Sequence, residues 1–159
     1  MISRNEVLHN FNALYLCKTN KKEEVKNMNW KYVKREGNPE DLFSFERLYH
    51  FSFPEDFEEY SIAHDGDCPD KKSFKTVNDN TGVLKLFLSF DHDKKENAWN
   101  TYKQNKSFLS NKYVPFAVDI NGNLICFKRK NSKIVVVNRK TSEAEKISDS
   151  FSEFFNSLY

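Results

Sequence analysis

The stretch YVPFAVDINGNLICF, residues 113–127, decides the fold of this chain. Two apolar runs, Val114–Val118 and Leu124–Phe127, flank the polar sequence DINGN. The pair Asn121-Gly122 tolerates the positive φ angles that a tight turn between antiparallel strands requires. The sequence therefore predicts a β-hairpin at this point.

Further strand-like segments extend the hairpin into a sheet. Residues 83–91, VLKLFLSFD, alternate at period two, which predicts a strand with one apolar face: Leu84, Leu86, Leu88 and Phe90. After the hairpin, the polar tip KRKNSK leads into the apolar run Ile134–Val137, and Ala144–Ile147 is predicted to pair back as a short final strand. Residues 71–81, KKSFKTVNDNT, are polar and predict a loop.

Capping signals predict two helices before the sheet. Asn38 can cap a helix whose first position is Pro39, where the missing N–H of proline costs nothing. A second helix is predicted to start at Pro54 and to stop at Gly66, a residue that favours a left-handed terminus. The apolar stripes are Leu42, Phe45 and Tyr49 on the first helix and Phe57, Tyr60 and His64 on the second.

Two more helices are predicted within and after the sheet. Asp93 and Glu96 have the spacing of a capping box before an apolar set made of Ala98, Trp99, Tyr102 and Leu109. Ser150 and Glu153 have the same spacing, and the last helix carries an apolar stripe that should pack on the sheet: Phe151, Phe154, Phe155 and Leu158. Helices, an antiparallel meander and a closing helix make a single α+β domain.

The first 38 residues are predicted to extend this domain. Residues 4–18 have helical spacing, residues 21–27 can add a short second helical segment, and residues 30–33 can form a short strand. We therefore expect an N-terminal helical extension, residues 1–38, and a core domain, residues 39–159.

Composition narrows the function classes. The chain has 25 basic and 23 acidic side chains, and this balance argues against direct nucleic-acid binding by the whole surface. No apolar run is long enough to cross a bilayer and no secretory signal opens the chain, so no membrane partner is expected. Three widely spaced cysteines, Cys17, Cys68 and Cys126, suit a reducing cytoplasm. We expect a cytoplasmic protein.

A dense acidic block stands out against that balance. Seven carboxylates lie between residues 55 and 70 with no lysine or arginine among them: Glu55, Asp56, Glu58, Glu59, Asp65, Asp67 and Asp70. One interpretation is a solvated helix face whose first turn favours the acidic pair at 55 and 56. The other is a docking surface for a basic partner such as a nuclease, whose active site binds phosphates.

Other chemistry-bearing residues do not form a recognisable site. Asp91, His92 and Asp93 are adjacent on an extended segment and point in different directions, so no metal site is predicted. There is no nucleophile elbow and no glycine-rich phosphate loop, and Cys126 lies in an apolar strand as an inert thiol. The KRKNSK tip, residues 128–133, is interpreted as a solvated hairpin end. We predict no catalytic residue and no cofactor.

Three ordered patterns resemble the SUKH superfamily, the Smi/Knr-type proteins of fungal cell-wall regulation and bacterial toxin immunity. The first runs from Glu46 through FPEDFEEYSIAHDGDCP, and it matches at Phe53, Pro54, Phe57, Tyr60, His64, Gly66 and Pro69. The second is the 113–127 hairpin, which matches at Pro115, Phe116, Asp119 and Gly122. The third is DSFSEFFNSL, which matches at Ser150, Phe151, Phe154 and Phe155.

The resemblance covers roughly residues 42–159, with a few departures. His50 stands where a glycine is usual, and Asp65 and Asp67 replace the asparagine and second glycine of the family's turn. The resemblance implies a SUKH-like fold and a non-enzymatic protein that binds and neutralises a toxin encoded by an adjacent gene. A regulatory scaffold of the Smi/Knr type is the alternative, and a small hydrolase is a third hypothesis that would require a deep pocket with converging histidine and carboxylate groups.

Overall fold

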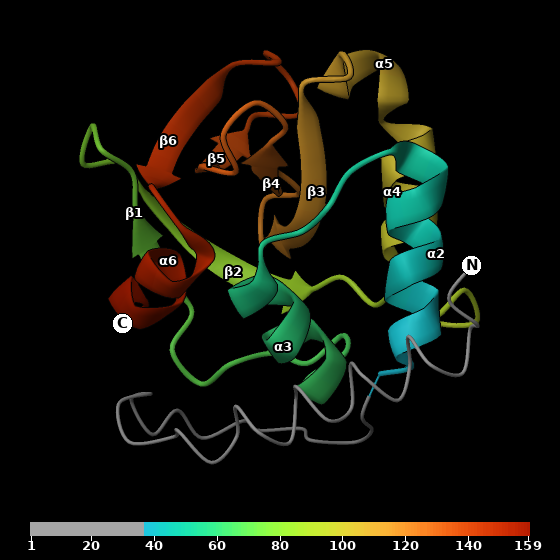
Figure 1. The fold of residues 1–159 in the computed structure, drawn as a ribbon. Helices are drawn as coiled ribbons and strands as arrows, with labels where there is room; N and C mark the ends of the chain where they lie inside the picture. Colours follow the sequence, from blue (N-terminus) through green and yellow to red (C-terminus); the bar gives the residue numbers. More distant parts are fainter. Residues whose placement is uncertain (1–36) are drawn as a thin grey trace.

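A computed structural model of the chain describes residues 37–159. The helices predicted within residues 4–27 and the strand predicted at residues 30–33 lie outside the described residues. The division of the chain at residue 38 therefore stays a prediction. The α+β fold class is confirmed by a six-stranded sheet with helices before, within and after it (Figure 1).

The sheet is an antiparallel meander in which each strand pairs with the next along the chain. Its strands are β1 (Ser73–Lys75), β2 (Thr81–Phe87), β3 (Tyr113–Asp119), β4 (Leu124–Lys128), β5 (Ile134–Val137) and β6 (Ala144–Ser148). The predicted hairpin is β3–β4, and Gly122 in its turn has a φ of 83°. The predicted third and final strands are β5 and β6.

Two strand predictions were wrong in part. Residues 71–81, expected to be a loop, contain β1, because Phe74 is the one buried hydrophobic residue in this polar segment and gives no periodic hydrophobic signal. The strand predicted through residue 91 ends at Phe87, and its pairing with β3 shifts register between Leu84 and Leu86. Because of this irregularity Phe87 is buried in place of Leu86, so strict period-two alternation fails.

The helices are α2 (Pro39–Tyr49), α3 (Glu55–Ala63), α4 (Ala98–Gln104), α5 (Lys106–Leu109) and α6 (Phe151–Ser157). The Asn38 side chain accepts from the Glu40 N–H, which confirms the first predicted cap. Ser150 caps α6 by accepting from the Glu153 N–H, also as predicted. The cap predicted at Asp93 was wrong, since Asn97 caps α4 by accepting from the Asn100 N–H. The single helix predicted there is divided in two, and Leu109 lies on α5.

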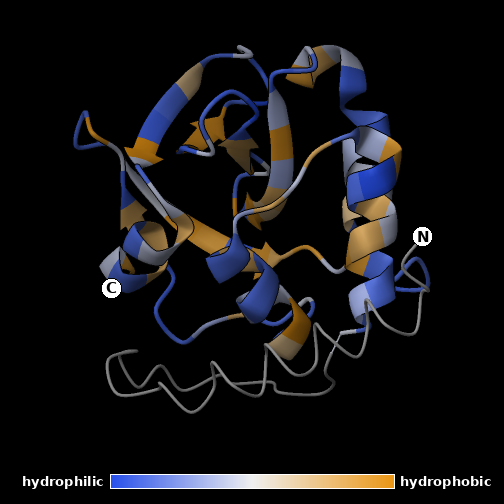
Figure 2. Ribbon diagram, in the orientation of Figure 1, coloured by the Kyte–Doolittle hydropathy of each residue, from blue (hydrophilic) through white to orange (hydrophobic). Residues whose placement is uncertain are grey.

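Aromatic rings fill the core between the helices and the sheet. The ring of Phe57 on α3 lies 5.3 Å from Phe116, 5.1 Å from Phe127 and 5.1 Å from Phe151. On the other side of the molecule α2 packs against α4, with Phe45 and Trp99 ring centroids 5.2 Å apart. Figure 2 shows hydrophobic residues on the central strands and hydrophilic residues on many connecting loops. The predicted stripe of α6 is fully buried: Phe151, Phe154, Phe155 and Leu158.

The sheet bends until its first hairpin meets its last strand. The Val77 N–H, in the β1–β2 turn, donates to the Lys146 carbonyl of β6 at 2.9 Å. Figure 1 shows the β1–β2 hairpin beside the end of β6. The meander is therefore partly closed on itself, and α3 and α6 pack together beside it.

Candidate partner-binding surface

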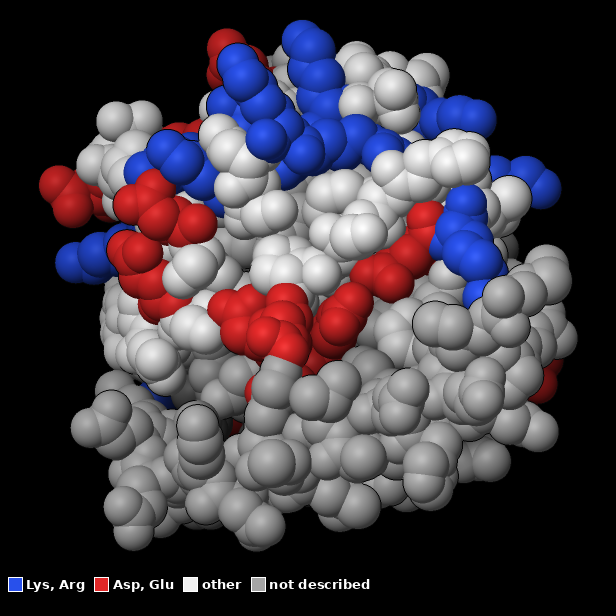
Figure 3. All heavy atoms as spheres, in the orientation of Figure 1, with Lys and Arg blue, Asp and Glu red and all other residues white. Residues whose placement is uncertain are grey.

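The acidic block occupies α3 and the turn that follows it. In Figure 3 acidic side chains gather on the face that carries α3, while lysine and arginine side chains gather mainly toward the top of the view. The seven carboxylates do not form one surface, however. Asp65 and Asp67 are buried and Asp56 caps a second helix, whereas Glu55, Glu58, Glu59 and Asp70 are at least partly exposed.

Asp56 joins the beginnings of two helices. One carboxylate oxygen accepts from the Ser152 N–H at 2.9 Å and from the Ser152 hydroxyl at 2.7 Å, and the other accepts from the Phe57 N–H at 2.9 Å. Ser152 lies in the first turn of α6, where N–H groups have no partner within the helix. Asp56 thus caps α6 from α3, a role the sequence prediction missed because the two residues are 96 positions apart.

Asp65 is buried and holds the chain after β2. Its carboxylate accepts from the Ser89 hydroxyl at 2.5 Å and from the Phe90 N–H at 2.8 Å. A carboxylate fixed in this way is not available to a partner. The family's asparagine at this turn offers one side-chain acceptor, whereas the aspartate here offers two and uses both.

Asp67 is also buried, with its Oδ2 atom 3.6 Å from Nδ1 of His64. Burial raises the pKa of the Asp67 carboxyl, the Lys94 charge partly opposes this rise, and the Asp65 carboxylate adds to it. The pair His64 and Asp67 lies at the C-terminal end of α3, next to Gly66 with its φ of 75°. The helix that was predicted to stop at Gly66 ends earlier, at Ala63, and Gly66 lies in the turn that follows.

The four remaining carboxylates are Glu55, Glu58, Glu59 and Asp70. Glu55 and Asp70 are exposed, and Glu58 and Glu59 are partly exposed on α3. We call Glu55, Glu58 and Glu59 the α3 acidic face. These three residues and Asp70 remain the candidates for partner contact, and Glu58 also makes a side-chain hydrogen bond with Glu46.

Glu46 borders the α3 acidic face, and the sequence prediction assigned it no chemical role. Its Oε1 atom accepts from the Phe53 N–H at 2.7 Å, which fixes the link between α2 and α3. Burial raises the pKa of the Glu46 carboxyl, while hydrogen bonds from Phe53 and with Glu58 partly oppose the rise. The available signal was the position of Glu46 in the first SUKH-like pattern, which marks the residue without giving its chemistry.

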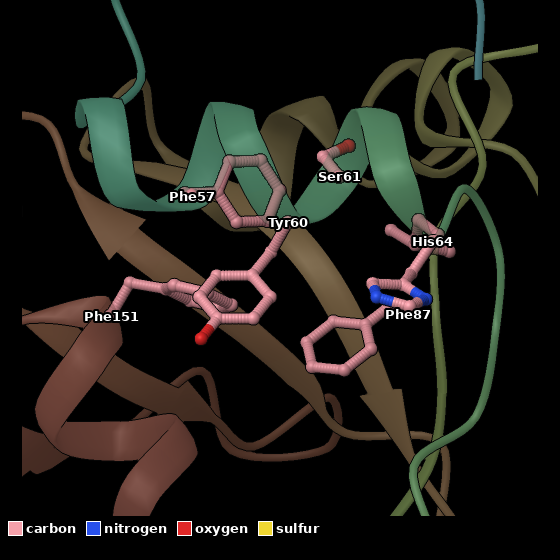
Figure 4. Close-up of a pocket in the computed structure, with 7 residues that line it drawn as sticks. Phe57, Tyr60, Ser61, His64, Phe87 and Phe151 are labelled. Carbon is pink, nitrogen blue, oxygen red and sulfur yellow. The ribbon is translucent and has the colours of Figure 1, made fainter. Parts of the chain in front are cut away.

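A small cavity lies under α3, lined by Phe57, Tyr60, Ser61, His64, Phe87, Leu88 and Phe151 (Figure 4). Figure 4 shows aromatic rings from α3, β2 and α6 meeting in this space. Its volume is about 10 Å³, close to what one water molecule needs, so it does not admit a substrate. Its described lining residues include His64 but no carboxylate, since Asp67, whose Oδ2 atom is 3.6 Å from His64 Nδ1, does not line the cavity. This cavity does not support the hydrolase hypothesis, which requires a deep pocket with both groups.

The other candidate residues serve the fold. His92 stacks on Trp99 with ring centroids 4.1 Å apart, and Asp91 accepts from the Asp93 N–H. Over the described part of the chain there is no group of three or more metal-ligating side chains. Cys126 is fully buried, and burial raises the pKa of its thiol well above the ordinary value. No helix among residues 37–159 is long and apolar enough to span a membrane.

The KRKNSK tip is only partly the solvated end that was predicted. Lys130 is exposed, but Arg129 folds back over the ring of Phe51, with the guanidinium carbon 5.7 Å from the ring centroid. Its guanidinium donates to the carbonyl oxygens of Tyr49 and His50. No local pattern in the sequence indicates this contact, because 79 or more positions separate the partners.

The sequence was compared with protein-family models and with curated proteins. Residues 37–157 match the model of the SMI1 / KNR4 family (SUKH-1). That range covers the whole sheet, α2 and α6, and thus most of the chain. Among curated proteins, none matches the chain.

Proposed function

Because the chain belongs to the SMI1 / KNR4 family (SUKH-1), which includes immunity proteins, we propose that it is a non-enzymatic immunity protein. It binds a bacterial toxin encoded by an adjacent gene and neutralises the toxin in the cytoplasm by covering its active surface. The family membership carries this proposal. A protein that inhibits a toxin by covering its active surface needs a rigid binding surface rather than a reactive centre. The packed aromatic core holds the helices and strands in fixed positions and so favours a rigid surface.

The α3 acidic face and Asp70 are the proposed docking residues. In this proposal the three glutamates of α3 meet basic side chains of the partner, and such complementary charges speed the encounter between two proteins. A nuclease is the toxin class that this charge fits, since its active site must attract phosphates. Asp56, Asp65 and Asp67 support the surface from within the fold and make no direct contact in this proposal.

Co-expression tests the function directly. The adjacent gene product is expressed in a bacterial host with and without this protein, and survival is measured. Rescue of growth together with a stoichiometric complex in size-exclusion chromatography is the expected result. A neighbour that is neither toxic nor bound by the protein would overturn the proposal, and capture of several regulatory proteins would favour the scaffold alternative.

The docking residues are tested with a matched pair of variants. Glu59→Lys with Asp70→Asn alters the proposed face, and Asp93→Lys with Asn100→Lys makes the same change in net charge on exposed residues elsewhere. We expect the first variant to weaken toxin binding by about tenfold or more at low salt, mostly through the association rate, and the second to leave it unchanged. Equal effects of the two variants would reject this face.

A further inference from the structure

Three hairpin turns lie at one end of the sheet. In an antiparallel meander alternate turns fall at the same end, so the β1–β2, β3–β4 and β5–β6 turns come together. The β4–β5 turn, which carries the KRKNSK tip, lies at the opposite end for the same reason. None of the three clustered turns contributes to the α3 acidic face.

The bend of the sheet draws these turns into one site. Glu145 of β6 accepts from the Thr76 hydroxyl at 2.6 Å and from the Asn80 side-chain amide at 2.9 Å. With the bond from Val77 to Lys146, these contacts join the first hairpin to the last strand. These hydrogen bonds hold the β1–β2 hairpin against β6, and the curved sheet encloses a space between the three turns.

That space is a groove of about 640 Å³, which we call the three-hairpin groove. Its walls include amide and carboxylate side chains from all three turns and from β6: Asn78, Asn80, Asn121, Asn138, Glu143 and Glu145. The volume lies within the range of about 300–1,000 Å³ that ligand sites occupy, and the open end of a curved sheet is a common place for such sites.

The groove is rich in hydrogen-bond acceptors, and three carboxylates line it, although Asp119 is buried and the guanidinium of Arg139 lies near Gly122 in the β3–β4 turn. Its charged lining residues are Asp119, Glu143 and Glu145, and among the described residues that line it none is a lysine or an arginine. The Asp119 carboxylate accepts from the Asn121 and Asn123 N–H groups, so the turn holds it in place. Hydrogen bonds from Thr76, and then Asn80 and Asn78, lower the pKa of Glu145 despite some desolvation, and this carboxyl stays ionised near neutral pH.

Two exposed apolar residues lie in the same turns. Val77 is 58% exposed between the β1–β2 lining residues Thr76 and Asn78, and Ile120 is 60% exposed between Asp119 and Asn121. Arginine and lysine side chains need both kinds of surface, since their aliphatic stems pack on apolar groups while their charged heads seek acceptors.

We propose that the three-hairpin groove receives an arginine or lysine side chain from a loop of the partner protein. The carboxylates and amide oxygens of the groove accept from the guanidinium or ammonium group, and the aliphatic stem lies against Val77 or Ile120. The groove residues are already ordered by the turn hydrogen bonds, so little side-chain entropy is lost on binding. This inference rests on the proposed function, because it assigns a second contact region to the same partner.

The first experiment measures partner affinity for a groove variant. Asn121→Lys with Glu143→Lys places two positive charges in the groove at exposed positions, and Asp93→Lys with Asn100→Lys is the control with the same change in net charge. We expect the groove variant to bind the toxin at least about tenfold more weakly than the control. Unchanged affinity of the groove variant would overturn the inference while leaving the immunity function intact.

The second experiment needs no partner and separates failure of the inference from failure of the proposed function. The full-length ¹⁵N-labelled protein is titrated with acetyl-Gly-Arg-Gly-amide, and with the same peptide containing citrulline as the uncharged control. We expect the arginine peptide alone to shift the side-chain amide signals of Asn78, Asn80, Asn121 and Asn138, and Asn121→Lys with Glu143→Lys to abolish the shifts. Shifts confined to α3, or equal shifts with both peptides, would overturn the inference.

Discussion

The guanidinium of Arg129 donates to the carbonyl oxygen of Tyr49 at 2.9 Å and so joins the β4–β5 hairpin to the last turn of α2. The same nitrogen donates to the Tyr102 hydroxyl at 2.9 Å, and Nη1 donates to the His50 carbonyl at 3.3 Å. The last carbonyls of a helix have no partner within the helix and carry partial negative charge, so a cation is favourable here. One side chain thus fixes three elements, α2, α4 and the hairpin.

Replacing Arg129 should therefore destabilise the protein more than replacing a solvated residue of the same turn. Arg129→Met keeps the stem over Phe51 but removes every donor, and we expect a loss of about 2–3 kcal/mol in the free energy of unfolding. Arg129→Lys should recover only part of this, because an ammonium cannot reach three acceptors in a fork geometry. Urea denaturation measures the loss, with exposed Lys130→Ala as control. Equal midpoints for the Met and Lys130 variants would contradict the structural role.

His50 ends α2 in the left-handed conformation, with φ of 50° and ψ of 48°. A side chain at such a position costs about 1 kcal/mol relative to glycine, which explains why glycine is usual there in the family. His50→Gly is expected to stabilise the protein by about 0.5–1 kcal/mol in thermal or urea unfolding. His50→Ala keeps a Cβ and should bring no such gain. A stabilising alanine and a neutral glycine would show that the histidine ring, not the backbone, matters.

Asp56 provides a test that separates folding from binding within the acidic block. Asp56→Ala removes the acceptor that caps α6, and we expect a loss of about 1–2 kcal/mol in the free energy of unfolding. Asp56→Asn keeps one acceptor oxygen and should lose less. Asp70→Ala, at an exposed position, should change stability by less than about 0.5 kcal/mol. Should Asp56→Ala unfold at the wild-type midpoint, the capping role would be wrong.

The sequence predicted those helices and strands that a short local pattern of residues is enough to specify. The β3–β4 hairpin follows from Asn121-Gly122 between two apolar runs, and α6 follows from Ser150 before an aromatic stripe. Such signals need only neighbouring residues. The strand β1 was missed because it has three residues and owes its place to Phe74 packing over Gly82 in the next strand.

The candidate surface was harder to predict, because exposure depends on distant residues. From the sequence, Asp65 and Asp67 were expected to be surface charges. In the structure Asp65 is hydrogen-bonded to Ser89 and Phe90, and Asp67 lies beside His64, so both are buried. Counting charges therefore predicted a binding set of seven residues, of which two are buried and one caps α6. Partner binding by the other four stays a prediction. The three-hairpin groove leaves no local signal, since its walls come from three separate turns, and the contact that joins the first turn to β6 spans 65 positions.

The two thiols described in the structure should differ in reactivity. Cys126 lies in the middle of β4 with no exposed surface, and burial holds its pKa well above the ordinary value. Cys68 is partly exposed, and its thiol donates to the Lys85 carbonyl at 3.0 Å. Because the thiolate is the reactive form, iodoacetamide should label Cys68 in the folded protein and Cys126 only after unfolding. Peptide mapping by mass spectrometry reads both sites, and early labelling of Cys126 would mean that β4 opens locally.

The Glu46 carboxyl should make stability depend on pH. Its pKa in the folded protein is raised above the ordinary value of 4.5, mainly by burial. The folded state therefore binds a proton more readily than the unfolded state, and the contribution to stability is fully present below pH 4.5 and is lost as the pH rises through the folded pKa. Glu46→Gln keeps the acceptor for the Phe53 N–H and cannot titrate. The stability of wild type relative to this variant should therefore rise as the pH falls from 7 toward 4.5.

Urea denaturation of both proteins across this pH range measures the difference. Glu46→Ala serves as the control, because it leaves the Phe53 N–H without its acceptor and should be less stable than Glu46→Gln by about 1–3 kcal/mol at every pH. A difference between wild type and Glu46→Gln that shrinks or stays flat as the pH falls would mean that the Glu46 carboxyl is not protonated more readily in the folded state. Burial would then be outweighed by the hydrogen bond from the Phe53 N–H and the hydrogen bond with Glu58, which favour the charged form.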